Sequence, residues 1–477
     1  MSPESKHRST IAAIATPEGF GGIGIVKVSG PESLPAISSL FRRGPPDPGR
    51  TGSLDSASTP GSFSPWRLYY GHIFDPESGR VIDEVILAVM PAPKSYTRED
   101  VVEIQSHGGP RVLHSILDLL IARGIRPAQP GEFTRRAFIN GRIDLTRAEA
   151  VADLINATSD AAVDMAVAQI SGGLSSVLIK VREALASALS EVEAAIDFSE
   201  EAEEGIETGR LVRLLYDNVN TPVQELIDAH EAGRFLRDGM KVVIAGGPNV
   251  GKSSLMNRLV NRERAIVTDI PGTTRDSIEA HLAVRGSPAI LVDTAGLRSD
   301  PDTVESLGIE KARDYIESAD IILFVVDMSK PVNGYETRVF EDLPDDRKIL
   351  VANKSDLTGP PDGFELPSQF TGFPCVCVSA LYGDGIAGLM DAIAEMASKA
   401  TDVSNPEFVP NWRQKVQLDR ISGAVSSAES GLASGGGSFE LASIDLRDAL
   451  NAVDEITGNY VSPDILDRIF SSYCIGK

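Results

Sequence analysis

Residues 246–253 have the sequence G-G-P-N-V-G-K-S, which matches the pattern G-x-x-x-x-G-K-[ST] of a phosphate-binding loop. The apolar run 242–245 before it predicts a buried strand that leads into the loop. In such a loop, backbone N–H groups surround phosphates at the N-terminus of a helix. Lys252 then supplies positive charge to the β and γ phosphates, and the Ser253 hydroxyl binds Mg²⁺. Taken alone, the pattern could also be a glycine-rich surface turn.

Two further motifs follow in the order expected of a GTP-binding domain. Thr273 and Thr274 lie at the spacing of a switch loop, where a threonine hydroxyl completes the coordination of Mg²⁺ when the γ-phosphate is present. The sequence D-T-A-G at 293–296 follows a strand-like run, which places Asp293 near the metal and the Gly296 amide near the γ-phosphate. Together they favour the phosphate-binding interpretation over a surface turn.

The base-reading motif N-K-S-D at 353–356 identifies the nucleotide. The Asp356 carboxylate can accept two hydrogen bonds from guanine, a pair that adenine cannot offer, so we expect GTP. Ser379 and Ala380, after the expected strand Cys375–Val378, would close over the guanine O6. The predicted GTP contacts are Asn249, Val250, Gly251, Lys252, Ser253, Ser254, Thr268, Asp269, Ile270, Pro271, Gly272, Thr273, Thr274, Asp293, Thr294, Ala295, Gly296, Asn353, Lys354, Ser355, Asp356, Ser379, Ala380 and Leu381, with Ser253 and Thr274 as Mg²⁺ ligands and Lys252 also catalytic.

One position departs from familiar small GTPases, which carry a glutamine just after D-x-x-G to orient the attacking water. That position is Leu297 in this chain, so the water must be oriented by another residue. The sequence also offers no evident arginine finger. Because charge on the transition state must still be neutralised, another cation is needed.

The 477 residues predict about three domains. Short β-rich runs and a helix with Val112, Ile116 and Leu119 on one stripe predict an N-terminal α+β domain over 1–125. Helical patterns dominate 126–238 and 401–477, and their apolar stripes would pack together as one discontinuous helical domain. Strands alternate with helices over 239–400, which predicts a doubly wound, Ras-like P-loop GTPase domain inserted in the helical domain.

Composition narrows the class of protein. The net charge of −23 argues against non-specific coating of nucleic acid, although a local basic site remains compatible with it. Three cysteines do not predict a disulfide framework. No apolar run reaches the roughly 20 residues of a membrane span, so we expect a cytoplasmic protein without membrane segments. The stretch 42–65 is rich in Pro, Gly and Ser and predicts a surface loop.

Six motifs together point to one family. They are G-G-I-G-I-V-K-V-S-G at 21–30, H-G-G-P at 107–110, P-G-E-F-T-R-R-A-F at 130–138, T-D-I-P-G-T-T-R-D at 268–276, D-T-A-G-L-R at 293–298 and C-I-G-K at 474–477. With them the chain closely resembles, over essentially its whole length, the MnmE/TrmE family of tRNA-modifying GTPases. The resemblance implies a homodimeric GTPase that modifies carbon 5 of the tRNA wobble uridine.

The resemblance also implies an answer to the missing cation. In the family a K⁺ ion takes the place of an arginine finger. The matching ligands here are Asn249 and the switch-loop residues Thr268, Ile270 and Thr273. Glu305 matches the family's water-orienting glutamate. From the residues alone, Asn249 could equally serve its own loop backbone, and Glu305 could be a solvated helix residue. Dimerisation of the GTPase domains would close the K⁺ loop.

The first domain of the family holds a cofactor of the 5-formyl-tetrahydrofolate type as a one-carbon donor, and it also forms the dimer. The matching positions are Lys27, Glu103, Arg142 and Lys477. Glu103 can pair with the pterin edge, while Lys27 and Arg142 can pair with the folate carboxylates. The family more often has arginine at position 27, and lysine keeps the charge but loses the bidentate geometry.

Cys474 lies four residues from the C-terminus and matches the family's catalytic thiol, as nucleophile or acid. From residue type alone, a free cysteine is more often a small hydrophobic residue. A local cluster of positive charge has two interpretations that stay open: contact with tRNA phosphates, or balance for Glu132, Asp144 and Glu149. The cluster consists of Arg135, Arg136, Arg142 and Arg147.

The family works with an FAD- and NADH-dependent subunit of the MnmG (GidA) type, in a heterotetramer or larger assembly. It installs an aminomethyl or carboxymethylaminomethyl group on tRNA. Two rivals have discriminating features. A ribosome-maturation GTPase would carry its own RNA module, such as a KH domain, where this C-terminal region shows Ala-rich helices. A free-standing folate-dependent transferase with a regulatory GTPase would leave wobble uridines unchanged when deleted.

Overall fold

The computed structural model describes residues 9–17, 19–44, 63–157, 159–197, 208–237, 239–263, 279–285, 287–293, 314–358, 367–400, 409–433 and 439–477. It divides into two compact units, each described by itself below. One contains Met1–Ala152 with Asp454–Lys477, and the other contains Asp153–Val453. The C-terminal tail therefore belongs to the same unit as the N-terminal sheet. The domain boundaries expected from the sequence stay predictions.

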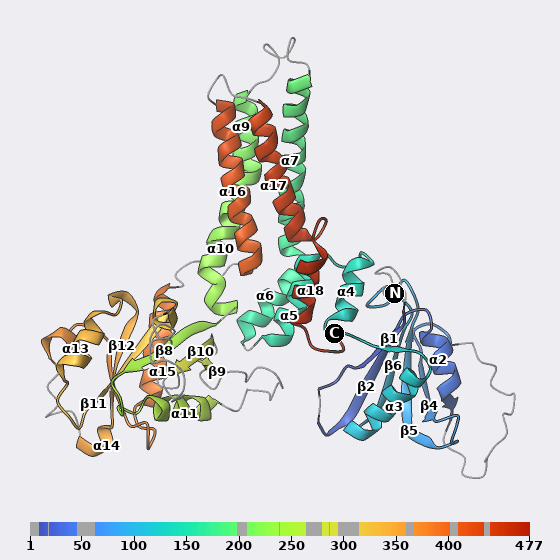
Figure 1. The fold of residues 1–477 in the computed structure, drawn as a ribbon, viewed down its shortest axis with the longest axis horizontal. Helices are drawn as coiled ribbons and strands as arrows, with labels where there is room; N and C mark the ends of the chain where they lie inside the picture. The colour runs from blue at the N-terminus through green and yellow to red at the C-terminus, as the bar shows by residue number, and fades with distance from the viewer. Residues whose placement is uncertain are drawn as a thin grey trace, which may run out of the picture. The chain divides into compact units, whose positions relative to one another are not determined.

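The first unit is built on a seven-stranded sheet in the order β3-β4-β5-β6-β2-β1-β7 (Figure 1). Every pairing is antiparallel except that of β1 with β7. Its elements are β1 Ile11–Ile14, β2 Gly21–Ser29, α2 Ser33–Leu40, β3 Phe41–Arg43, β4 Leu68–Phe74, β5 Val81–Met90, β6 Val101–Gly108, α3 Pro110–Ala122, β7 Arg126–Pro127, α4 Glu132–Ile139, α5 Leu145–Asn156 and, from the C-terminus, α18 Pro463–Ser471.

Helices α2 and α3 cover one face of this sheet. Alternate strand residues such as Val26, Leu87 and Ile104 are buried against Ile37 of α2 and Ile116 of α3. The predicted α3 stripe is correct in its period but its centre is shifted: Leu113, Ile116 and Leu120 are buried, whereas Val112 and Leu119 are only partly buried beside them. Val112 and Leu119 thus flank the stripe that packs on the sheet instead of forming it.

The second unit contains a six-stranded sheet in the order β13-β12-β11-β8-β10-β9, parallel except for β9. Apolar cores lie on both of its faces, one against α11 and α15 and the other against α13. This is the doubly wound fold expected from the sequence. Its elements are β8 Met240–Gly246, α11 Lys252–Glu263, β9 Glu279–Val284, β10 Ser287–Asp293, β11 Ile321–Asp327, α13 Gly334–Glu341, β12 Lys348–Asn353, α14 Ser355–Thr358, β13 Cys375–Val378 and α15 Ile386–Ala400.

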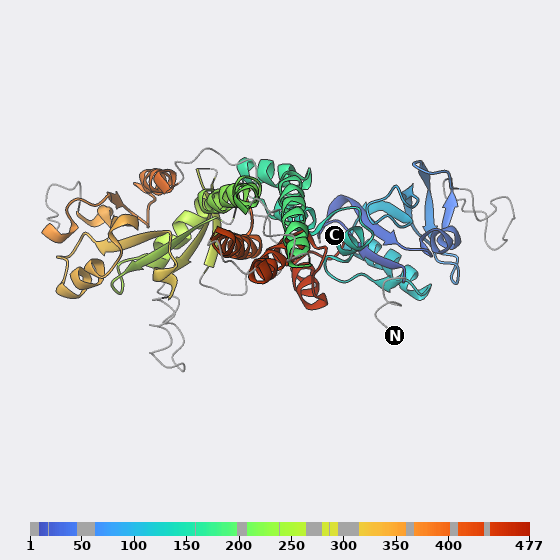
Figure 2. The same ribbon diagram turned by 90° about the horizontal axis from the view of Figure 1, so that it is seen from above.

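Long helices from distant parts of the chain lie side by side in the same unit (Figures 1 and 2). Arg447 of α17 donates to Glu193 of α7 at 2.6 Å, and Asn220 pairs with Glu429 of α16 at 3.2 Å. These contacts confirm a helical part assembled from both sides of the inserted sheet. Its elements are α6 Asp160–Ile170, α7 Gly173–Asp197, α9 Thr208–Leu215, a π-helix Tyr216–Asn220, α10 Thr221–Arg237, α16 Trp412–Ala433 and α17 Phe439–Thr457.

All three cysteines, Cys375, Cys377 and Cys474, are free. Within the described ranges, no helix on its own has both the length and the apolar composition of a membrane span; the bent pair α6 and α7 meets that test only when taken together. Most of the predicted loop 42–65 lies outside the described residues.

Candidate functional site

The phosphate-binding loop connects the end of β8 to the start of α11. Gly246 has φ +140°, and a Cβ there would lie 2.3 Å from the Val325 carbonyl oxygen. Gly251 has φ +98°, and a Cβ there would lie 2.3 Å from the Asn353 amide nitrogen. Asn249 between them is left-handed at φ +63°. The loop therefore needs glycine at its two ends, both for backbone conformation and for close approach of the neighbouring strands.

Two side chains at the start of α11 have the positions expected of phosphate and metal ligands. Lys252 is buried, and its ammonium donates to the carbonyls of Gly246 at 3.1 Å and Gly247 at 2.6 Å, across the mouth of the loop. The Ser253 hydroxyl donates to the Asp293 carboxylate at 2.6 Å. A hydroxyl and a carboxylate in contact form the hard oxygen donor set that suits Mg²⁺.

The base-reading residues are tied to the phosphate loop by Asn353, which is 2% exposed. Its amide donates to the Val250 carbonyl at 2.8 Å, and its oxygen accepts from the Ala380 N–H at 3.0 Å. The Ser379 hydroxyl donates to Asp356 at 2.7 Å. Three motifs that are distant in sequence thus meet at the C-terminal edge of the parallel strands, where ligands bind in such sheets.

Sequence reasoning missed two residues of this site. Asp327 ends β11 and accepts from Lys354 at 2.7 Å, while Lys354 also donates to the Asn249 carbonyl at 3.1 Å. Arg258 of α11 donates to the Ala380 carbonyl at 3.0 Å. A signal for Asp327 was present, since it ends a buried strand as Asp293 and Asn353 do. The sequence carries no comparable signal for Arg258.

Several predicted site residues lie outside the described residues. They are Thr268, Asp269, Ile270, Pro271, Gly272, Thr273, Thr274, Thr294, Ala295, Gly296 and Glu305, together with Leu297.

A second group of predicted residues meets in the first unit. Lys27 of β2 lies directly opposite Glu103 of β6 in the sheet, with 3.7 Å between Nζ and Oε1. Burial lowers the pKa of the Lys27 ammonium below its ordinary value; the Glu103 carboxylate partly offsets this, and Lys477 lowers it further. The ammonium of Lys27 is therefore incompletely compensated where it lies, and an added anionic group would stabilise its charged form.

Two aromatic rings lie beside Lys27, and we call the site formed by Lys27, Glu103, Arg142 and these rings the cradle. The Lys27 ammonium lies 5.7 Å from the centre of the Tyr96 ring and 5.5 Å from that of Phe133. Arg142 also packs on Tyr96. Its guanidinium carbon is 4.6 Å from the centre of the Tyr96 ring, and the guanidinium donates to the Tyr96 carbonyl at 2.9 Å. The Tyr96 hydroxyl contacts that of Thr134 at 3.0 Å. Neither ring was predicted, because nothing in the sequence around Tyr96 relates it to β2 or α4.

The C-terminal tail is fastened to the start of α4. The N–H of Gly131 donates to the Cys474 carbonyl at 3.3 Å, and that of Phe133 to the Lys477 carbonyl at 3.2 Å. Gly476 has φ +97°, and a Cβ there would lie 2.5 Å from the Ile14 carbonyl oxygen. The Tyr473 hydroxyl donates to the Ala148 carbonyl at 2.7 Å. The tail thus brings Lys477 and the exposed Cys474 to the unit that holds Lys27 and Glu103.

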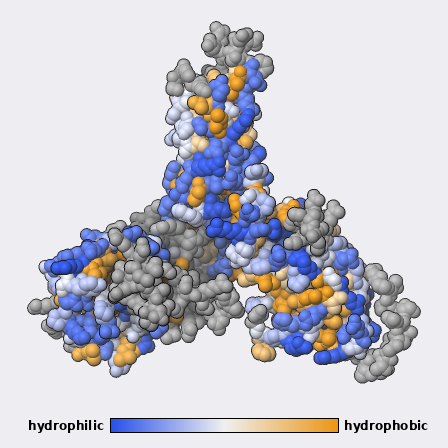
Figure 3. Space-filling view, viewed as in Figure 1, coloured by the Kyte–Doolittle hydropathy of each residue, from blue (hydrophilic) through white to orange (hydrophobic). Residues whose placement is uncertain are grey.

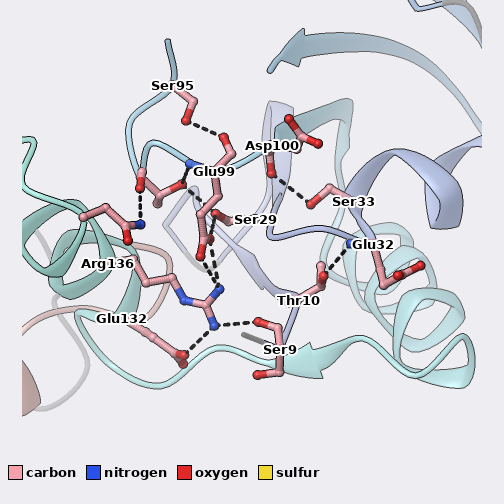
Figure 4. Close-up of polar contacts among 12 residues, drawn as sticks. Ser9, Thr10, Ser29, Glu32, Ser33, Ser95, Glu99, Asp100, Glu132 and Arg136 are labelled. Carbon is pink, nitrogen blue, oxygen red and sulfur yellow. Dashed lines mark hydrogen bonds and ion pairs between the residues drawn. The ribbon is translucent and has the colours of Figure 1, made fainter. Parts of the chain in front are cut away.

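The arginines around α4 are engaged within the protein. Arg136 is 3% exposed and donates to Glu99 at 2.9 Å, to Glu132 at 3.0 Å and to the Ser9 carbonyl at 2.7 Å (Figure 4). Arg135 pairs with Asp467, and Arg147 pairs with Asp144. Of the two open interpretations, these contacts favour internal charge balance over phosphate contact.

Comparison with known proteins identifies the family of the chain. Residues 10–142 match the family model described as GTP-binding protein TrmE N-terminus, and residues 145–474 match the one described as MnmE helical domain. The chain belongs to the MnmE family. Curated relatives named tRNA modification GTPase MnmE include those of Geobacter sulfurreducens, 44% identical over 470 residues, and Carboxydothermus hydrogenoformans, 42% identical over 472. Each alignment covers 98% of this chain and 99% of the relative.

Among solved structures, the G domain of the Thermotoga maritima FeoB iron transporter is 30% identical and aligns with a TM-score of 0.26, over 33% of this chain and 98% of that one. The two MnmE family models divide the sites between them. Lys27, Glu103 and Arg142 fall within the N-terminal match, and the phosphate-binding loop falls within the helical-domain match, which ends at Cys474.

Proposed function

We propose that the protein is a K⁺-activated GTPase that adds an aminomethyl or carboxymethylaminomethyl group to carbon 5 of the wobble uridine of tRNA. It works in the cytoplasm with an FAD- and NADH-dependent MnmG-type subunit, and a tetrahydrofolate supplies the one-carbon unit. GTP hydrolysis uses Mg²⁺ and drives a conformational cycle. The proposal extends the family membership of the chain to its substrates and partners.

The observation that carries the proposal is the cradle of the first unit. A GTPase that only switched conformation would need no second ligand site, yet Lys27, Glu103 and Arg142 meet around two aromatic rings there. A folate carries a flat heteroaromatic ring with polar edges, which suits the two aromatic rings and the charged groups that meet around them. Glu103 suits the amino edge of the pterin.

The C-terminal tail supports a chemical role for the cradle. Chain ends usually fray, but this tail is held by the backbone bonds at Gly131 and Phe133 and by Gly476 against Ile14. We assign Cys474 as the thiol of the modification reaction, because its exposed side chain lies on this fastened segment. Whether it acts as nucleophile or acid is decided by trapping a covalent adduct.

In the GTPase site, Lys252 neutralises phosphate charge while Ser253 and Thr274 hold Mg²⁺. Asn249 fits a K⁺ ligand because it is exposed at a left-handed position of the loop and offers a neutral amide oxygen. Backbone carbonyls of Thr268 and Ile270 and the Thr273 residue would complete the set, and Glu305 would orient water. When bound, K⁺ supplies the positive charge that an arginine finger gives other GTPases.

An exposed apolar face supports a homodimer through the first unit. Leu68 and Tyr70 of β4 are 66% and 52% exposed, and Ile86 of β5 lies opposite Tyr70 in the register. Ile23 of β2 is 67% exposed. Apolar residues also lie on the side of this unit that Figure 3 shows, where α3 is in front of the sheet in Figure 1. Apolar patches of this kind mark contact surfaces, and we propose that a second copy covers this one.

Two experiments test the proposal. Mass analysis of tRNA nucleosides from a deletion strain should show wobble uridines that lack the substituent. Unchanged nucleosides would contradict the proposed role in tRNA modification. Replacing Na⁺ by K⁺ should raise the rate of GTP hydrolysis by at least about tenfold, since the cation stabilises transition-state charge. Equal rates in the two salts would remove the K⁺ role while leaving the tRNA role untouched.

A further inference from the structure

Asp327 occupies a structural position that none of the motifs explains. It ends β11, is 8% exposed, and both of its carboxylate oxygens are engaged. Oδ1 accepts from the backbone N–H of Ser329 at 3.0 Å and from its hydroxyl at 2.6 Å. Oδ2 accepts from the Lys354 ammonium at 2.7 Å. With three donors the carboxylate is fixed, so it acts as a rigid anchor for Lys354.

Lys354 in turn holds the phosphate loop. Its ammonium donates to the Asn249 carbonyl at 3.1 Å while it pairs with Asp327. Both Lys354 and Asn249 are left-handed, at φ +66° and +63°. A left-handed lysine is uncommon and costs about 1 kcal/mol, so contacts must hold it. The bonds therefore form a chain from Asp327 through Lys354 to Asn249, and each link fixes the next.

A separate contact holds the neighbouring residue of the loop. The Val250 carbonyl accepts from the side-chain amide of Asn353, the residue that lies beside Asp327 in the pairing of β11 with β12. The phosphate loop thus has two braces, one at Asn249 and one at Val250. Loss of the Asp327 brace would free Asn249 while leaving the rest of the loop attached to β12.

We propose that Asp327 is a positioning residue for the activating cation: through Lys354 it holds the peptide of Asn249 so that the amide side chain of Asn249 faces K⁺. The inference rests on the proposed K⁺ role of Asn249. Neutral amide oxygens bind K⁺ weakly, so a ligand that must first be ordered binds it more weakly still. A braced Asn249 is ordered before the cation arrives.

The same chain links guanine recognition to the cation. Lys354 lies between Asn353 and Ser355 in the base-reading motif, and its ammonium reaches the loop that holds phosphate. Lys354 therefore joins the base-reading motif to the loop that carries Asn249.

The test compares Asp327→Asn in the full-length protein with the matched control Asp345→Asn. Asp345 is an 81%-exposed carboxylate of the same unit that pairs with Lys348 rather than with the nucleotide site. The concentration of K⁺ needed for half-maximal effect is measured in two ways. One is the GTP hydrolysis rate, and the other is the fluorescence of methylanthraniloyl-GDP with aluminium fluoride, which reports assembly of the site without turnover.

For Asp327→Asn we expect the half-maximal K⁺ concentration to rise at least about fivefold in both assays, because the ion pair with the Lys354 ammonium becomes a weaker bond from the ammonium to a neutral amide. The rate at saturating K⁺ should return to within about twofold of the parent. Asp345→Asn should match the parent. A role confined to folding would lower the melting temperature and leave the K⁺ midpoint unchanged, and that result overturns the inference.

Two outcomes remain distinct from these. If the parent protein itself responds equally to Na⁺ and K⁺, the proposed K⁺ activation fails and this inference fails with it. If Asp327→Asn does not fold, Ser329→Ala removes one of the three donors to the carboxylate and should raise the K⁺ midpoint by a smaller factor, about twofold. An unchanged midpoint in Ser329→Ala, with a folded protein, would then overturn the inference.

Discussion

The two candidate sites differ in how the chain assembles them. The nucleotide site is made of short motifs that each follow a parallel strand. Because the carboxyl ends of parallel strands lie at the same edge of a sheet, the strands alone bring these motifs together. The cradle of the first unit combines β2, β6, the segment around Tyr96, the start of α4 and the last residues of the chain. No strand order alone would bring these five segments together.

This difference predicts how each site fails. In the nucleotide site the strands and Asn353 hold the motifs, so removal of a side chain should act only on the ligand or on the loop residue that this side chain contacts. In the cradle, the position of each ligand depends on packing contacts made by other segments. Variants should therefore affect chemistry in the first case and assembly in the second.

The largest effect is expected from Lys252→Ala. The buried ammonium lies 2.6 Å from the Gly247 carbonyl of the phosphate loop, and removing a preorganised charge of this kind costs about 100-fold or more in rate. GTP hydrolysis should fall by that factor, measured as phosphate release at saturating GTP.

Binding of 5-formyl-tetrahydrofolate by the same variant is the control, and calorimetry should give the parent dissociation constant. If Lys252→Ala weakened folate binding as well, the two sites would not be independent in assembly, and the contrast drawn between them would be wrong.

Gly476→Ala tests the cradle of the first unit by changing the backbone of the C-terminal tail. Its φ of +97° is unfavourable for alanine, and the new Cβ would lie 2.5 Å from the Ile14 carbonyl oxygen. The tail must therefore shift, with strain of about 1 to 3 kcal/mol. Folate affinity should fall at least about tenfold, while GTP hydrolysis keeps the parent rate.

A matched glycine provides the control. Gly423 lies within α16, and a Cβ added there would have nothing within 4 Å. Gly423→Ala should therefore leave folate binding unchanged and stabilise the helix by up to about 1 kcal/mol. Parent-like folate affinity in Gly476→Ala would show that the tail contributes nothing to the cradle.

The same contrast explains what the sequence could and could not predict. The doubly wound fold of the inserted domain and the meeting of Lys252, Ser253 and Asn353 at one edge of its sheet follow from local motifs and from the geometry of parallel sheets. Lys27 and Glu103 were named as site residues only by resemblance, and their pairing across the sheet was not predicted. Tyr96 and Phe133 were missed, because their proximity arises from tertiary packing that leaves no periodic pattern in the sequence.

Asp327 and Arg258 show what could not be predicted from sequence even within the nucleotide site. A carboxylate at the end of a buried strand is visible in sequence, but its partner Lys354 could not be known before the strand order β12-β11-β8 was seen. Arg258 lies on the exposed side of a helical pattern, where arginine is ordinary, and only the fold shows that it holds the Ala380 loop.

Lys27→Met is expected to have an intermediate effect. The variant keeps the length of the side chain and removes its charge, so one charge-assisted contact to the folate is lost, worth about 1.4 kcal/mol or tenfold in affinity. The measurement is the dissociation constant of 5-formyl-tetrahydrofolate. Lys27→Arg, which restores the charge, should bind at least as well as the parent; an unaffected Lys27→Met would exclude Lys27 as a ligand contact.

The smallest effect concerns pH and compares the parent with Lys27→Met in the absence of folate. The folded-state pKa of Lys27 is lowered, chiefly by burial, from an ordinary value of 10.5. Between the lowered value and 10.5 the unfolded chain binds more protons than the folded one, so this group makes stability rise with pH. Below the lowered pKa, the buried charge lowers the free energy of unfolding by an amount that does not change with pH.

The melting temperature of the parent, relative to that of Lys27→Met, should therefore increase as pH rises toward 10.5. A difference that stays constant over this range would mean that the ammonium is as well solvated in the cradle as in the unfolded chain, and the cradle would then have no bias toward an anionic ligand.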